Sequence, residues 1–467
     1  MYQSKFIDIF EKLTKAERHQ FRKWTQSPFA NAREDVAKLV EFVLSKRSIT
    51  AATVNRKQAF AFVFPYKKFD EQLLRYTMSY ATDCLEAFLS YYNWKEDTLQ
   101  PSIVLTQTYN QRNLNSLAVK QLTATQNSLQ QSVFKDSQHY AQTFSLEVVR
   151  YNLMSKNKRY EDFNLQKISD SMHQYAIVEI LRYACVAQSF KQVSGKTTEF
   201  LLLDAIVQLI EIGHYKDEAA IQIYYLLYRL TTQPNDNDFD KLYDAVFKYE
   251  SCFKENELKD IFLLTINYCI KQLNTGKQLY AQRAFTLYLH ALDKKYLLEN
   301  GELSRFTFKN IAYIGIKRLQ DFNRSSQFID KYNIYVNEAF RENSIQFTKA
   351  TLYYAQKQYS KAMRILQTVE FTDVLWNIDA KILIIKMLFE LKEFDSILPQ
   401  IKSLKMYVYR QNDIGYFKTI HQKTIVYVGL LYKNIFASKT QKSKFKIAIE
   451  SEKDLVEKEW LLEILNI

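Results

Sequence analysis

The chain has 467 residues, of which 47% are hydrophobic and 25% are charged, a balance that excludes an intrinsically disordered protein. It contains only 7 Gly and 5 Pro, which excludes a sheet-rich fold with many tight turns, so we expect an all-α protein. The net charge of +13 would favour an acidic partner if it were concentrated, but spread evenly over the chain it describes a solvated surface, the interpretation we favour.

The first predicted helix is well delimited. Thr14 and Glu17 have the spacing of a capping box, in which both side chains accept hydrogen bonds from amide groups at a helix start. Ser27 precedes Pro28, and the residue before a proline is driven out of the helical conformation. We therefore expect a helix over about 15–25.

Three more helices complete an N-terminal helical module over residues 1–95. They are expected because apolar residues recur with helical spacing in the segments 33–44, 59–63 and 69–92. Residues 93–101 are the expected linker to the rest of the chain.

The first helix also carries a candidate contact to phosphate groups. Its basic side chains are Lys15, Arg18, Arg22 and Lys23. Phe21 and Trp24 stand among them and suit base stacking as well as a core, and no base-reading helix follows. The alternative to a phosphate contact is a solvated helix face.

Residues 102–467 are predicted to form a helical-repeat array. In the segment 102–191 helices continue without a clear repeat register. Beyond residue 197 the helices shorten and alternate with turns, which we expect at 213–214, 233–238, 274–276, 300–301 and 411–415.

The clearest repeat lies at residues 344–405. Ala350 and Tyr353 lie on one expected helix, whereas Tyr359 and Ala362 begin the next. Phe394 follows Tyr359 by 35 residues and has the same place after a turn.

This pattern resembles the tetratricopeptide repeat, whose units of about 34 residues are antiparallel helix pairs with small residues in each helix and an aromatic residue at the turn. The resemblance covers about residues 200–440 and implies an α-α superhelical array after the N-terminal helical bundle. The sequence departs from the family at Val369 and Ile397, where small residues are expected, and the family's terminal proline is absent. The peptide-carboxylate clamp of some members has no matching residues here, so the resemblance implies no specific ligand.

A C-terminal capping helix is expected over 450–464. A solenoid needs a terminal helix with one polar face, and the acidic residues of this segment supply that face. Trp460, Leu461 and Ile464 would form the inner face.

Two short motifs resemble ligand sites but lack an essential part. Gly195-Lys196-Thr197 matches the end of a phosphate-binding loop, yet Phe190 stands where that motif needs a glycine. Glu211 and His214 have the spacing of half a di-iron site, which needs a second such pair. We interpret both as parts of turns and helix ends and expect no metal and no cofactor.

No catalytic motif and no export signal is found. The six His and four Cys residues are scattered, with no Cys-x-x-Cys pair, so neither a disulfide framework nor a zinc cage is indicated. Asp8 and Glu11 interrupt the first apolar stretch, and the longest apolar runs fall short of the roughly 20 residues that cross a bilayer. We expect a cytoplasmic protein.

Three hypotheses of function follow. The first is a non-catalytic scaffold that binds a peptide, a helix or a protein partner on a superhelical surface. The alternative is a nucleic-acid-associated regulator that uses the basic N-terminal helix, in which case replacing its four basic residues by alanine should abolish retention of nucleic acid. An enzyme would need a polar cluster assembled only in three dimensions.

Overall fold

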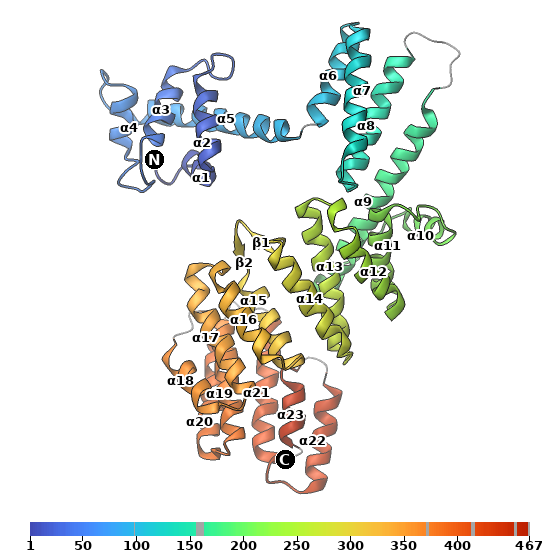
Figure 1. Ribbon diagram of the computed structural model, residues 1–467. Helices are drawn as coiled ribbons and strands as arrows, with labels where there is room; N and C mark the ends of the chain where they lie inside the picture. Colours follow the sequence, from blue (N-terminus) through green and yellow to red (C-terminus); the bar gives the residue numbers. More distant parts are fainter. Residues whose placement is uncertain (98, 156–162, 370–372, 412–415, 453–454, 466–467) are drawn as a thin grey trace. The chain divides into compact units, whose positions relative to one another are not determined.

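The computed structural model describes residues 1–467 except 98, 156–162, 370–372, 412–415, 453–454 and 466–467. The described residues form twenty-three α-helices and one pair of short strands, so the all-α prediction is confirmed. The chain divides into two compact units, Met1–Ile177 and Val178–Ile467, and the boundary falls within helix α9 (Leu165–Ser194) (Figure 1). None of the described helices is long and apolar enough to cross a membrane.

The first unit contains eight helices before α9. They are α1 (Lys5–Lys12), α2 (Lys15–Gln26), α3 (Glu34–Leu44), α4 (Arg56–Val63), α5 (Glu71–Glu96), α6 (Leu99–Gln111), α7 (Asn115–Gln131) and α8 (Ser137–Met154).

Helices α1 to α5 share one aromatic-rich core, which confirms the four helices expected in the first 95 residues and adds α1. The capping box at Thr14 and Glu17 is present, and α2 ends at Gln26. Phe21 is fully buried, with its ring centroid 5.3 Å from that of Phe88 on α5. Helix α2 is thus amphipathic: its apolar side faces the core and its basic residues face outward.

The linker expected at 93–101 is shorter than predicted. Helix α5 continues to Glu96 and α6 begins at Leu99. Pro101 does not break α6 because it lies in the first turn, where the amide hydrogen that proline lacks would have no partner within the helix. Helices α6, α7 and α8 contact one another around a core that includes Ile103, Leu122 and Val149.

The second unit holds the end of α9 and fourteen further α-helices among its described residues. They are α10 (Leu203–Glu211), α11 (Ala219–Thr232), α12 (Asp236–Lys248), α13 (Glu255–Asn274), α14 (Leu279–Asp293), α15 (Arg305–Tyr313), α16 (Phe322–Tyr332), α17 (Glu338–Ala355), α18 (Tyr359–Thr368), α19 (Val374–Glu390), α20 (Phe394–Arg410), α21 (Tyr416–Asn434), α22 (Lys439–Ser451) and α23 (Lys458–Leu465). Short 3-10 turns lie at η1 (Glu250–Cys252) and η3 (Asn333–Tyr335), and a π-helix lies at η2 (Ile314–Arg318).

Two turns of the predicted repeat have the same geometry. Lys357, after α17, and Lys392, after α19, both have left-handed backbones, with φ of 60° and 59°. In each turn the next amide donates back to the carbonyl five residues earlier, from Gln358 to Tyr353 and from Glu393 to Leu388. These are Schellman turns, which usually place glycine at the left-handed position. Lysine there fits a chain with few glycines.

The turn expected at Asn300-Gly301 is a small hairpin. Strands β1 (Leu298–Glu299) and β2 (Glu302–Leu303) pair antiparallel across it. Both turn residues have positive φ, which is the conformation that Asn-Gly pairs favour in two-residue hairpins. The turn expected at 411–415 lies largely outside the described residues.

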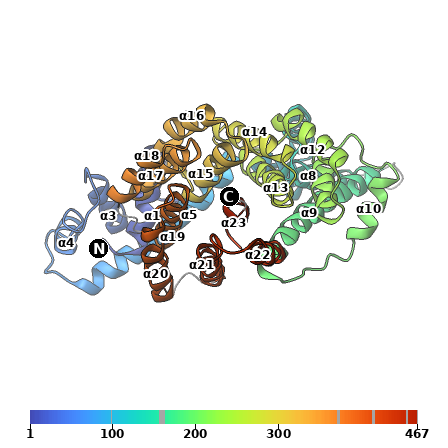
Figure 2. The ribbon, with the colours of Figure 1, turned by 90° about the horizontal axis from the view of Figure 1, so that it is seen from below.

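Helices α15, α17 and α19 lie side by side in the second unit. Helix α17 contacts both α15 and α19 (Figure 2). Near the C-terminus, α23 contacts α21 and α22 (Figure 1). The segment expected as one capping helix, 450–464, contains the end of α22 and most of α23, and Trp460 and Leu461 of α23 are buried.

Candidate functional site

The candidate site is a cavity of about 220 Å³ inside the second unit. Its walls come from α15, η2, α17, α19 and the residues just before α23. Apolar side chains and charged side chains share the lining. The lining residues are Lys309, Ala312, Tyr313, Ile316, Lys317, Phe347, Thr348, Thr351, Asp379, Ile382, Leu383, Lys386, Val456 and Glu457.

Two of the three lysines of the cavity have carboxylate partners. Lys309 of α15 pairs with Asp379 of α19. Lys386, whose side chain is only 2% exposed, pairs with Glu457. A buried ammonium without such a partner would be strongly unfavourable, so Glu457 stabilises Lys386 inside the fold, whereas Lys309 is partly exposed.

Lys317 is the third lysine, and it is held differently. Its ammonium lies 4.3 Å from the ring centroid of Tyr354 on α17, and no hydrogen bond or ion pair joins it to a described residue. The lining thus has three lysines against two carboxylates, which leaves one positive charge.

The π-helix η2 explains how Lys317 reaches the cavity. The Leu319 amide donates to the Ile314 carbonyl, five residues earlier, at 3.0 Å. Such a bulge rotates the following residues relative to a regular α-helix, and bulges of this kind are frequent at functional sites. Gly315 permits the close packing of η2 on α16, because an added Cβ would collide with Oγ of Ser325.

The environment of Lys317 disfavours its charged form. Burial first, and then the charge of Lys386, lower the pKa of Lys317 to about 8, against the opposing charges of Glu457, Glu463 and Glu390. An amine with such a pKa is partly neutral near physiological pH. A perturbed amine in a cavity is typical of functional sites, although ion-pair networks also produce such shifts.

Glu457, which lines the cavity just before α23, has an unusual backbone conformation. Its backbone has a φ of 61°, which is rare for a residue other than glycine. Burial opposes the negative charge of Glu457, but Lys386 outweighs it, by its charge and its hydrogen bond, so the pKa of Glu457 stays below its ordinary value. Nearby, Glu459 accepts two hydrogen bonds from Arg318, at 2.7 and 2.9 Å. These contacts fix the start of α23 against η2 and α19.

Exposed apolar side chains border the cavity. Tyr313 and Val456 line it and are 41% and 36% exposed. Phe306 is 47% exposed and precedes Tyr313 by seven residues on α15, so the two rings share one face of that helix. The arrangement offers apolar contact and one positive charge, which suits an anionic or acidic group on an apolar body.

The basic residues of α2 are not assembled into a comparable site. Arg22 pairs with Glu41 of α3 at 2.6 Å. Arg18 donates to the carbonyl of Glu11 at 3.0 Å and lies over the ring of Phe10. Lys15 and Lys23 are exposed. Whether this face contacts phosphate groups stays a prediction.

The two aromatic residues of α2 belong to the fold. Phe21 is fully buried, and the ring of Trp24 lies 5.1 Å from that of Tyr91 and 6.0 Å from that of Phe88. Of the two roles considered for them, the core accounts for both positions.

The repeat-defining residues lie in structural positions near the cavity. Ala350 and Ala362 are fully buried where α17 packs on α18, and Tyr353 and Tyr359 pack against the same core. Phe394 begins α20, with its ring 5.1 Å from that of Phe436.

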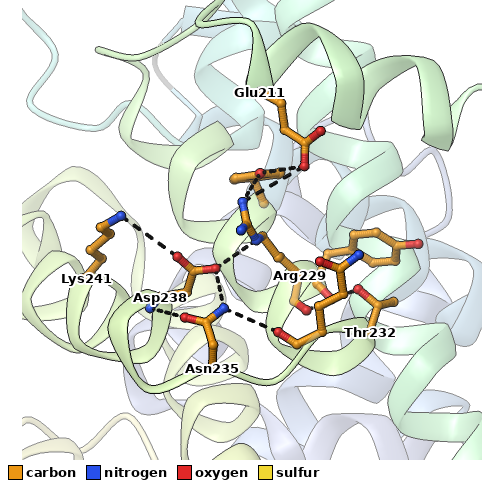
Figure 3. Close-up of polar contacts among 9 residues, drawn as sticks. Glu211, Arg229, Thr232, Asn235, Asp238 and Lys241 are labelled. Atoms are coloured by element: carbon orange, nitrogen blue, oxygen red, sulfur yellow. Dashed lines mark hydrogen bonds and ion pairs between the residues drawn. The ribbon is translucent and has the colours of Figure 1, made fainter.

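Glu211 takes part in a polar network and not in a metal site. Its carboxylate accepts a hydrogen bond from the Tyr225 hydroxyl at 3.3 Å, and that hydroxyl accepts one from Arg229 (Figure 3). Arg229 in turn lies 2.8 Å from the carboxylate of Asp238, which is held by Asn235. The network ties α10, α11 and α12 together, and its charges are mutually compensated.

The other ligand-like motifs also have structural roles. Gly195 has a φ of 71° and ends helix α9, so a helix and not a strand precedes the Gly-Lys-Thr sequence. Within the described parts of the chain, no group of three His, Cys, Asp or Glu side chains is arranged to hold a metal ion.

Sequence reasoning missed the cavity because its charged residues are far apart in the chain. Lys309 and Asp379 are 70 residues apart, and Lys386 and Glu457 are 71 apart. One signal was available: Lys386 interrupts the apolar run of α19, which is otherwise a stretch of isoleucine, leucine and methionine. A lysine in such a run predicts a buried partner.

Comparison with known proteins provides no family. No protein-family model, no curated protein and no solved structure matches the chain. Function therefore rests on the geometry of the molecule itself.

Proposed function

We propose that the chain is a non-catalytic cytoplasmic scaffold that binds a protein or peptide partner on a tetratricopeptide-like array of helix pairs. The observation that carries the proposal is the exposed ring of Tyr313, which lines the cavity, together with the exposed ring of Phe306 on the same face of α15. Exposed aromatic side chains beside a pocket are the usual anchors of binding energy in interfaces.

The expected partner segment combines apolar anchors with acidic side chains. Around the rim, Arg305, Lys309 and Arg318 already pair with carboxylates of the chain itself. Lys317 is the cation of α15 and η2 that has no ion pair with a described residue, so an acidic side chain of the partner would find its counter-charge there.

The repeated Schellman turns at Lys357 and Lys392 support the array part of the proposal. The two turns lie inside successive helix pairs, α17 with α18 and α19 with α20, and give the two pairs the same internal connection, as units of one repeat have.

The test is a pull-down from native cell lysate with the tagged full-length chain, with and without nuclease. We expect a stoichiometric protein partner that survives nuclease and is lost from the double variant Phe306→Ala/Tyr313→Ala. The matched control is Tyr409→Ala, which removes another ring, 70% exposed, from α20. A partner retained equally by all three proteins would contradict the proposed surface.

The same pull-down tests the alternative that the chain binds nucleic acid. Retained material that vanishes with nuclease would favour it, and the variant Lys15→Ala/Arg18→Ala/Arg22→Ala/Lys23→Ala would then lose binding in a salt-dependent manner. We do not favour this alternative because Arg18 and Arg22 are engaged within the module.

A further inference from the structure

One lysine that lines the cavity, Lys317, forms no ion pair with the described residues. The segment of α15 and η2 contributes four cations to this region. Three of them, Arg305, Lys309 and Arg318, pair with Asp373, Asp379 and Glu459. Lys317 is the exception, with only the face of Tyr354 beside its ammonium.

Three carboxylates, Glu457, Glu463 and Glu390, act on Lys317 by their charge, but none of them forms an ion pair with it among the described residues. Glu457 pairs with Lys386, and Asp379 pairs with Lys309. A buried ammonium is stabilised either by losing its proton or by gaining an anion, and a ligand carboxylate in the cavity would supply the ion pair that Lys317 lacks.

The lining of the cavity that contains Lys317 also has apolar side chains. Ile316, Ile382, Leu383 and Val456 line it together with Phe347. A ligand that fills this space would bury apolar surface, and its charged end would meet the ammonium. We infer that the cavity is a binding site for a small organic carboxylate with an apolar body, whose carboxylate pairs with Lys317. The inference goes beyond the proposed scaffold because it needs no protein partner.

A phosphate group fits the cavity less well than a carboxylate. Phosphate oxygens need several donors, whereas the hydroxyls of Thr348 and Thr351 already donate to backbone carbonyls of α17, at 2.7 and 2.9 Å. The ammonium of Lys317 is the one lining lysine without a carboxylate in the described structure. A single positive charge matches a single carboxylate.

Binding should depend on pH in a defined direction. Because the pKa of Lys317 is lowered to about 8, the ammonium is present below pH 8 and is lost above it. A carboxylate binds the ammonium form, so its affinity should be constant below pH 8 and fall by roughly tenfold per unit above it.

The test is isothermal titration calorimetry of the full-length protein with hexanoate, with hexanamide as the neutral match and with inorganic phosphate. We expect hexanoate to bind and Lys317→Met to weaken it by at least about tenfold, since a charge-assisted hydrogen bond is lost. Lys402→Met is the matched control, because Lys402 is an exposed lysine of α20, and it should leave the affinity unchanged.

Four results would overturn the inference. They are the absence of hexanoate binding at millimolar concentration, equal affinity for hexanamide, tighter binding of phosphate than of hexanoate, and an affinity unchanged by Lys317→Met. Circular dichroism confirms that the variant is folded, and the pH dependence of hexanoate binding to the unmodified protein provides a second measurement that needs no variant.

Discussion

The N-terminal module and the cavity region bury different chemistry. In residues 1–92, all of which the structure describes, the buried polar residues are three threonines, Thr25, Thr77 and Thr82, and no charged side chain is buried. In the cavity region a lysine is buried to 2% exposure and pairs with a carboxylate 71 residues away. The module keeps its many basic groups in solvent, where they cost the fold little. Burying a charge carries a desolvation penalty. A buried charge is therefore a stronger indication of a functional site than a charge on the surface.

The largest expected effect tests the apolar side of this comparison. Phe21→Ala should lower the free energy of unfolding of the module by about 4 kcal/mol, because it empties a fully buried aromatic position. Urea denaturation followed by circular dichroism measures the loss. Phe29→Ala, at a fully exposed ring, is the control and should stay within about 0.5 kcal/mol. A small effect at Phe21 would show that the module is not held by this core.

The next effect tests the charged side. Glu457→Gln should lower the free energy of unfolding by about 3 kcal/mol, because it leaves the buried ammonium of Lys386 without its counter-charge. Glu459→Gln removes a carboxylate that is 70% exposed and should cost less than about 1 kcal/mol. The double variant Glu457→Gln/Lys386→Met should recover most of the loss. If the double variant does not recover the lost stability, the ion pair of Lys386 and Glu457 does not account for the effect of Glu457→Gln.

A smaller effect appears in the pH dependence of stability. The pKa of Lys317 is lowered from 10.5 to about 8, so between these values the unfolded chain binds more protons than the folded one, and stability rises with pH. Lys317→Met should remove this rise, which we expect to be on the order of 1 kcal/mol for a partly exposed group. Unfolding curves at pH 7.5 and 10 for both proteins give the difference. If the free energy of unfolding changes equally with pH in both proteins, Lys317 is solvated in the folded state.

The smallest effect is expected on the surface of the module. Arg22→Ala breaks an ion pair with Glu41 in which both side chains are partly exposed, so stability should change by less than about 1 kcal/mol. The same denaturation experiment measures it. A larger loss would mean that the basic helix face contributes to the fold and would weaken the contrast between the two regions.

Local features of the fold were predictable from the sequence. The capping box joins Thr14 to Glu17, three residues later, and the hairpin turn consists of Asn300 and Gly301. Each feature therefore depends on a short stretch of sequence. Ala350 and Ala362, which the sequence offered as small residues on two successive helices, are fully buried where α17 packs on α18.

The site was not predictable for two physical reasons. Lys386 and Glu457 are brought together only by tertiary packing. The sequence around either residue does not identify the other as its partner. The π-helix at η2 shifts the helical register by one residue, so a regular 3.6-residue period places Lys317 on the wrong face of its helix.

The π-helix also has a consequence for the history of the site. One surplus residue in a helix turns all that follow by about 100°. Deleting a single residue from the segment Ile314–Arg318 would restore a regular helix and carry the ammonium of Lys317 away from the cavity. The difference between a purely structural helix and one that presents an amine to a ligand is then a single codon, and a relative of this chain without that codon would share the fold and lack the site.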